Sequence, residues 1–258
     1  MSELDELAER GKPASPWLLT VDARVKIVLV ALGLLLNLLA ADVRVPLGLT
    51  AVALAGLWSA NAARRYGWRR LLVALPVVLV LPLVEMLFRG GHPLLVLHFA
   101  GRSVVFYREG LDYGILLVTR VMAGVALLAL LQAAVPGPEL LAGIGWLGVP
   151  ALLVEIALLV WRYVFVLAEE TLRIRGAARV RLGMAGWRLA LFSYSSLAGM
   201  ILWRAFDRAE SVHRAMRARA YRGQVVPAAP PPLARRDLLA GAGGIVLLLL
   251  VFSLGNWT

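Results

Sequence analysis

Five long apolar runs constrain this chain more than any other feature of its sequence. A helix that crosses about 30 Å of hydrocarbon needs roughly 17–25 predominantly apolar residues. Runs of about this length cover 25–41, 45–61, 71–88, 111–135 and 238–254. Because 60% of all residues are hydrophobic, one soluble core of this size could not hide them. The sequence therefore predicts an all-α, polytopic membrane protein with about five transmembrane helices.

Two further apolar pieces, 150–168 and 189–203, lie between the fourth and fifth runs. Either both pieces cross the membrane or neither does, because the topology of the remaining spans must be kept. Fourteen arginines lie in 136–236. If both pieces crossed, the short loop between them would lie outside with five of these arginines, namely Arg173, Arg175, Arg179, Arg181 and Arg188. Short basic loops resist translocation, so we predict that neither piece crosses. The predicted parts are an N-terminal segment with four spans in 1–135, a cytoplasmic helical unit in 136–236, and the last span with an outer tail in 237–258. The amino terminus is then cytoplasmic.

Two ionisable residues, Glu85 and Arg120, fall inside the predicted third and fourth spans. A charge at membrane depth is costly unless it has a partner or a function. We favour a structural ion pair between the two side chains over a functional site. The outer segment 89–110 alternates and contains glycine turns, which predicts either a small hairpin or a partly inserted loop.

A repeated arginine pattern is the second constraint. The segments AARVRL at 177–182 and AMRARA at 215–220 each place an alanine two residues before Arg-x-Arg. The two copies are 38 residues apart, near the ends of separate predicted helices, the second of which covers 202–222. Cations suit the carboxyl end of a helix, and arginine offers a planar fork for a carboxylate. The candidate binding residues are Ala178, Arg179, Arg181, Ala215, Arg217, Ala218 and Arg219.

With these two motifs the chain resembles the T component of energy-coupling-factor (ECF) transporters, and most closely the cobalt-type CbiQ family. The second motif departs from the family form at Ala220, where glycine is common, and the first departs at Leu182. The resemblance implies a non-enzymatic coupling subunit, in the inner membrane of a prokaryote, of a cobalt importer. Its implied partners are two ABC-type ATPase subunits and a substrate-binding membrane subunit. Arg179 and Arg217 would be the main anchors on the ATPases, with Arg181 and Arg219 beside them.

Several alternatives remain open from the residues alone. The arginines could simply face lipid phosphates, and the importer could carry nickel or a vitamin, with identical or different ATPases. An enzyme acting on a lipid phosphate is disfavoured because no acidic residue lies between 173 and 188. A stand-alone channel is disfavoured because the spans carry few polar groups.

Other candidate sites are weaker. No Walker A motif occurs, and the chain has no cysteine. His92 and His98 offer too few ligands for a metal site, and we expect no metal, no cofactor and no nucleic-acid partner. The GAGG stretch at 241–244 lacks the strand that precedes a dinucleotide site, so close helix packing is favoured. Asp207 and Glu210 are interpreted as solvated salt-bridge partners of nearby arginines.

Overall fold

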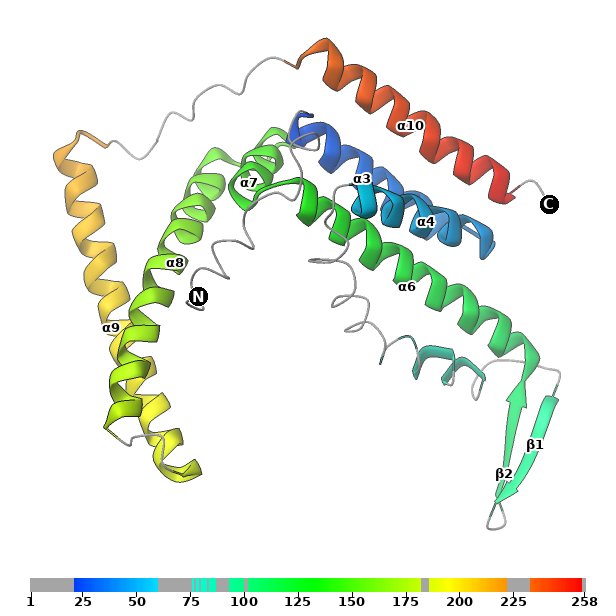
Figure 1. The fold of residues 1–258 in the computed structure, drawn as a ribbon, viewed down its shortest axis with the longest axis horizontal. Helices are drawn as coiled ribbons and strands as arrows, with labels where there is room; N and C mark the ends of the chain where they lie inside the picture. Colours follow the sequence, from blue (N-terminus) through cyan, green and yellow to red (C-terminus); the bar gives the residue numbers. More distant parts are fainter. Residues whose placement is uncertain are drawn as a thin grey trace. The chain divides into compact units, whose positions relative to one another are not determined.

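The computed structural model describes residues 21–59, 93–99, 102–181, 186–221 and 233–256, with parts of 76–86. The described chain is helical apart from one hairpin, so the predicted all-α class is confirmed. Most of the predicted third span and the amino-terminal segment 1–20 lie outside the described residues. The elements (Figure 1) are α3 (Ala23–Leu39), α4 (Arg44–Ser59), β1 (Pro93–Phe99), β2 (Arg102–Tyr107), α6 (Arg108–Ala134), α7 (Gly137–Trp146), α8 (Ala151–Val180), α9 (Trp187–Ala218) and α10 (Arg235–Asn256).

The chain divides into two compact units. A span unit contains α3, α4, α6, α10 and the hairpin, and a two-helix unit contains α8 and α9. Small and branched apolar side chains form the core of the span unit, because helices in lipid associate through close packing rather than through hydrophobic burial. One core cluster consists of Leu36, Ala40, Val45, Leu49, Ala123 and Leu248.

Glycines bring α10 close to α3. A Cβ atom placed on Gly244 would lie 2.7 Å from the Cδ1 atom of Leu29, and one on Gly241 would also meet a side chain of α3. Gly243 differs, because a Cβ atom there would meet nothing within 4 Å. The interpretation of 241–244 as a close-packing segment is therefore confirmed.

Buried polar contacts join one end of the span unit. The Lys26 Nζ atom, near the start of α3, donates to the carbonyl oxygen of Ala134 at the end of α6 over 3.1 Å. The Asp237 carboxylate, in the first turn of α10, accepts from the backbone N–H groups of Asp22 at 3.1 Å and Ala234 at 2.9 Å. These contacts satisfy backbone groups that helix ends leave unpaired. The starts of α3 and α10 and the end of α6 thus share one end of the bundle, as the predicted alternation of spans requires.

Arg120 joins α6 to the other end of α3. Its guanidinium donates to the carbonyl oxygen of Ala40, the residue that caps α3, and its own carbonyl oxygen accepts from the Asn37 Nδ2 atom at 3.0 Å. The guanidinium therefore satisfies an end carbonyl of α3. The predicted ion pair of Arg120 with Glu85 stays a prediction.

Strands β1 and β2 form an antiparallel hairpin ahead of α6. Pro93 pairs with Tyr107 at its open end, and Phe99 pairs with Arg102 at its turn. Of the two alternatives for 89–110, the hairpin is therefore confirmed, and β2 continues directly into α6 (Figure 1).

The two-helix unit consists of α8, with 30 residues, and α9, with 32. Their side-chain contacts run in opposite directions: Glu155 near the start of α8 meets Tyr221 just after α9, and Glu170 meets Arg204. The helices are therefore antiparallel. The two pieces predicted as separate, 189–203 and 202–222, form one continuous helix up to Ala218, because no proline interrupts residues 187–218.

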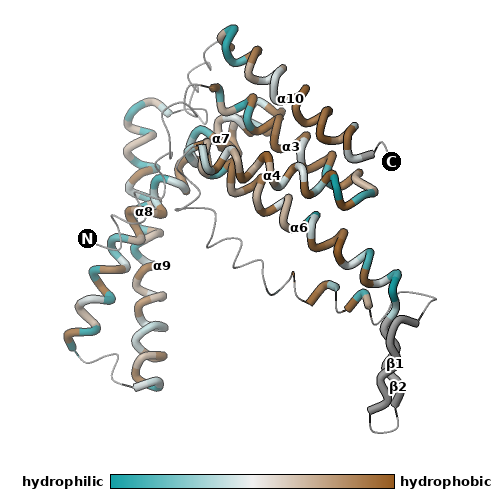
Figure 2. Tube along the Cα trace, turned by 45° about the vertical axis from the view of Figure 1, so that its right-hand side comes forward, coloured by the Kyte–Doolittle hydropathy of each residue, from teal (hydrophilic) through white to brown (hydrophobic). Residues whose placement is uncertain are grey.

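By length and composition, four described helices could cross a membrane, namely α6, α8, α9 and α10. α6 and α10 match the predicted spans 111–135 and 238–254. α3, with 17 residues, is at the lower limit of the length that a span needs, and α4, with 16, is just below it. Figure 2 shows apolar residues predominating along α10, whereas α8 and α9 mix apolar and polar residues. Since α8 and α9 are long enough to cross, the cytoplasmic placement of 136–236 stays a prediction.

Candidate functional site

The first arginine motif lies at the carboxyl end of α8. Arg179 is in the last turn, and Arg181 is the C-cap, whose backbone N–H donates to the carbonyl oxygen of Ala177 at 3.2 Å. Cations are favoured here because the last carbonyl groups of a helix carry partial negative charge. Arg179 and Arg181 are both exposed, and Ala178, directly before Arg179, is half-buried.

The second motif ends α9 in a Schellman turn. Arg217 is in the last turn and Arg219 is the C-cap. The backbone N–H of Ala220 donates to the carbonyl oxygen of Arg217 at 3.0 Å, and the N–H of Tyr221 donates to that of Met216 at 3.0 Å. These two bonds are the defining pair of the Schellman motif. They fix the backbone that carries both arginines.

Sequence and structure agree on where the motifs lie. Both arginine pairs are at helix carboxyl ends, as predicted from their spacing, and in the second motif Ala215 and Ala218 are exposed beside them. Among the described residues, none of the four motif arginines has an ion-pair partner, whereas other arginines of the same helices do. The four guanidinium groups are therefore available to a partner.

Ala220 adopts a left-handed backbone conformation, with φ of 61°. Glycine is preferred at this position of a Schellman turn because a Cβ atom costs about 1 kcal/mol there. Ala220→Gly should therefore raise the free energy of unfolding by up to about 1 kcal/mol, measured as a higher midpoint in thermal unfolding in detergent.

Ala209→Gly is the control for this substitution. Ala209 lies inside α9, where glycine costs about 1 kcal/mol relative to alanine, so that variant should lose stability. A fall in stability for both variants would contradict the left-handed assignment of Ala220.

A tyrosine connects the second motif to α8. The Tyr221 hydroxyl donates to the Glu155 Oε1 atom over 2.8 Å. The carboxylate raises the pKa of the Tyr221 hydroxyl above its ordinary value, mainly through this hydrogen bond, so the group stays protonated at neutral pH. No sequence pattern indicated this contact, because its two residues are 66 positions apart.

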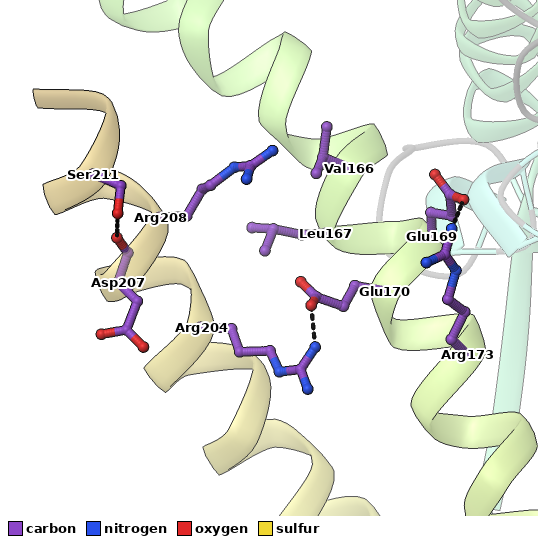
Figure 3. Close-up of a pocket in the computed structure, with 9 residues that line it drawn as sticks. All are labelled: Val166, Leu167, Glu169, Glu170, Arg173, Arg204, Asp207, Arg208 and Ser211. Atoms are coloured by element: carbon purple, nitrogen blue, oxygen red, sulfur yellow. Dashed lines mark hydrogen bonds and ion pairs between the residues drawn. The ribbon is translucent and has the colours of Figure 1, made fainter. Parts of the chain in front are cut away.

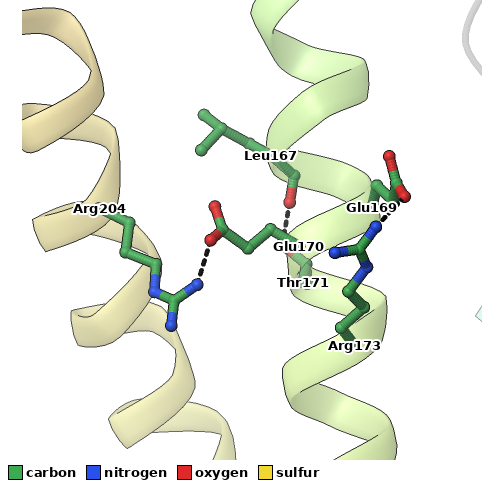
Figure 4. Close-up of polar contacts among 6 residues, drawn as sticks. All are labelled: Leu167, Glu169, Glu170, Thr171, Arg173 and Arg204. Carbon is green, nitrogen blue, oxygen red and sulfur yellow. Dashed lines mark hydrogen bonds and ion pairs between the residues drawn. The ribbon is translucent and has the colours of Figure 1, made fainter. Parts of the chain in front are cut away.

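A second polar contact joins the two helices farther along. Arg204 of α9 pairs with Glu170 of α8, and Arg173 pairs with Glu169 within α8 (Figure 4). The side chains of Arg204 and Glu170 point toward each other (Figure 3). Together with Asp207 and Arg208 they line an open pocket of about 450 Å³.

The predicted pairing on the polar face of α9 is confirmed at one residue. Glu210 lies 4.0 Å from Arg214, and both side chains are well exposed, as expected for a solvated pair.

Within the described ranges, no three histidine, cysteine, aspartate or glutamate side chains gather as metal ligands would. The two-helix unit presents a pair of arginine-bearing helix ends, a chemistry suited to recognition of carboxylates or phosphates.

Comparison with known proteins points to cobalt transport proteins. Residues 14–228 match the profile of the family CbiQ, described as cobalt transport protein. A cobalt transport protein CbiQ of Rhodobacter capsulatus is 34% identical over 148 residues, which are 57% of this chain and 60% of that protein. An uncharacterized protein of Methanocaldococcus jannaschii is 31% identical over 125 residues, 48% of this chain and 47% of that protein.

A third relative is longer. It is described as a putative fused cobalt transport protein CbiMQ of Methanocorpusculum labreanum, and it is 27% identical over 157 residues, which are 57% of this chain and 26% of that protein. The chain thus matches about half of the first two relatives' lengths and about a quarter of the third.

Proposed function

We propose that this chain, which belongs to the CbiQ family of cobalt transport proteins, is the transmembrane coupling (T) subunit of an ECF-type cobalt importer. In this role it catalyses no reaction itself. It passes the movement of ATP-hydrolysing partners to a substrate-binding membrane subunit. The observation that carries the proposal is the pair of exposed arginine motifs at two helix ends of one antiparallel helix pair.

Two ATPase subunits are the proposed partners of these ends. Because α8 and α9 are antiparallel, Arg179 and Arg217 lie toward opposite ends of the pair. Along α8, the position of Arg179 and the position opposite Arg217 are about twenty residues apart, which corresponds to a distance on the order of 30 Å at 1.5 Å per residue. One chain can therefore reach a carboxylate-bearing groove on each of two separate ATPase subunits.

The substrate-binding partner is inferred from the fused relative. Its name describes CbiM and CbiQ parts in a single chain, which supports association of this chain with a CbiM-type membrane subunit. Two polypeptides that occur fused in one protein are expected to lie in contact when they are separate.

The cytoplasmic side is the proposed location of α8 and α9. In the antiparallel pair, the apolar first half of α8 is level with the second half of α9, which carries Asp207, Arg208, Glu210 and Arg214. If α8 crossed the bilayer there, these charges would lie at membrane depth, at a cost of about 2.5–3.5 kcal/mol each. The pairing of apolar with charged halves therefore supports a location at the cytoplasmic surface, in line with the arginine distribution.

Topology is tested by single cysteines in a chain that has none of its own. Ala178→Cys and Ala218→Cys should be shielded from a membrane-impermeant reagent added outside intact cells, whereas Asn256→Cys should react. All three should react after the membrane is permeabilised. Labelling of Ala178→Cys in intact cells would contradict the proposed orientation.

Substrate identity is tested by uptake. Cells or vesicles that contain this chain with its ATPase and CbiM-type partners should accumulate radioactive cobalt in an ATP-dependent manner. Removal of this chain should reduce uptake to background. Uptake of nickel or of a vitamin in place of cobalt would keep the coupling role but reject the proposed substrate.

A further inference from the structure

The end of α9 is attached to α8 by a side chain that lies directly beside the second arginine motif. Tyr221 follows Arg219 by two residues, and its hydroxyl reaches Glu155 in the second turn of α8 at 2.8 Å. Glu155 and Arg162 are the charged residues of the otherwise apolar stretch 151–168. A carboxylate in such a stretch is favoured when a hydrogen-bond donor reaches it.

The backbone of Tyr221 belongs to the same turn as the arginines. Its N–H donates to the carbonyl oxygen of Met216, and the preceding N–H, of Ala220, donates to that of Arg217. A Schellman turn leaves the residue at this position little freedom, because both bonds close on the last helical turn. A displacement of the helix end that carries Arg217 therefore also displaces the Tyr221 backbone.

The space that Tyr221 bridges is an open apolar groove. The groove has a volume of about 350 Å³ and lies between α8 and α9, with Tyr221 among its lining residues. The other lining side chains include Ile156, Tyr163, Val212 and Met216. Such an open groove gives little packing that would hold the two helices at a fixed spacing. The Tyr221 hydrogen bond, the distant Arg204–Glu170 pair and the Arg208 guanidinium over the Tyr163 ring are among the contacts that join them.

We infer that Tyr221 and Glu155 are positioning residues, which clasp the second arginine end to α8 so that a displacement of that end by an ATPase moves α8 with it. The inference rests on the proposed function for its mechanical role. The first arginine end, by contrast, lies on α8 itself. Both arginine ends would then act on the same helix, one through the continuous backbone and the other through the clasp.

The clasp itself is tested on the purified chain without any partner. Spin labels are placed at Leu153→Cys on α8 and Ser211→Cys on α9, two exposed positions in a chain without native cysteines. Tyr221→Phe should broaden the measured distance distribution between the labels, and Glu155→Leu should do the same. Glu155→Gln should keep the distribution narrow, because the amide oxygen still accepts the hydrogen bond.

Coupling is tested on the complex with its ATPases. Tyr221→Phe and Glu155→Leu should still retain the ATPase subunits, but cobalt uptake per ATP hydrolysed should fall about three- to tenfold, the range for one hydrogen bond. Glu155→Gln should couple like the unaltered chain. Tyr163→Phe, which also removes a hydroxyl in the groove but leaves the ring that faces Arg208, is the control and should have no effect.

The outcomes separate the two claims. A Tyr221→Phe chain with an unchanged label distribution and unchanged coupling overturns the clasp, and so does a Glu155→Gln chain that behaves like Glu155→Leu. An unaltered chain that retains no ATPase overturns the proposed function instead, while the label distances still decide whether the clasp exists.

Discussion

Replacing both Arg179 and Arg217 by alanine should abolish retention of the ATPase subunits and uptake of cobalt. Each arginine lies exposed at a helix end without an ion-pair partner among the described residues. Truncating one side of a desolvated arginine–carboxylate contact costs about 2–5 kcal/mol, because the partner charge is left buried. Each single variant should weaken assembly, and the double variant should lose it, since two attachments on one complex reinforce each other.

Lysine variants distinguish this account from contact with lipid phosphates. Lysine keeps the charge but loses the planar fork, so Arg179→Lys and Arg217→Lys should also weaken ATPase retention. If the arginines met only lipid headgroups, the lysine variants would be nearly silent.

A matched control is available on the same two helices. The double variant Arg175→Ala, Arg214→Ala removes the same charge from exposed positions outside the motifs. It should retain the ATPases at close to the unaltered level. Equal losses in the control and the motif variant would show a general charge effect and would reject the two arginine ends as specific sites.

Gly244→Leu should weaken the packing of the last span on α3. A Cβ atom at this position already lies 2.7 Å and 2.8 Å from the two Cδ atoms of Leu29, and the rest of a leucine side chain needs more room. Forcing such a side chain into a packed interface costs about 1–3 kcal/mol or more. We expect a large loss of folded chain in mild detergent, measured by size-exclusion yield and thermal unfolding.

The neighbouring glycine provides the control. Gly243→Leu gives the same gain in helix propensity, but a Cβ atom there meets nothing within 4 Å, so this variant should be tolerated. Leu29→Ala should partly rescue Gly244→Leu by restoring space. If Gly243→Leu and Gly244→Leu lost stability equally, the packing of α10 on α3 through this glycine would be wrong.

The elements that could be predicted from the sequence are those specified by local pattern. Apolar length predicted α6 and α10, glycine spacing predicted close packing at Gly244, and the repeated Arg-x-Arg predicted two equivalent helix ends. Each of these features depends on residues within a single helix. The length and periodicity of the sequence pattern were therefore sufficient to predict these elements.

The contacts that were missed join residues far apart in the chain. Tyr221 and Glu155, and Lys26 and Ala134, meet only because of how helices cross, which no local pattern encodes. The continuity of α9 was missed for a different reason. Its first half is apolar and its second half charged, and a change of composition suggested a boundary where the helix backbone does not break.

The central claim, a non-enzymatic coupling subunit, is tested most directly by what is bound to the chain in its native membrane. The tagged chain is extracted in mild detergent, and the co-purifying proteins and the ATPase activity are measured before and after the partners are stripped away. The account predicts two ABC-type ATPase subunits and a substrate-binding membrane subunit for each chain, with ATP hydrolysis that disappears when the ATPases are removed. A chain that purifies without ATPases, or an isolated chain that still hydrolyses ATP, would contradict it.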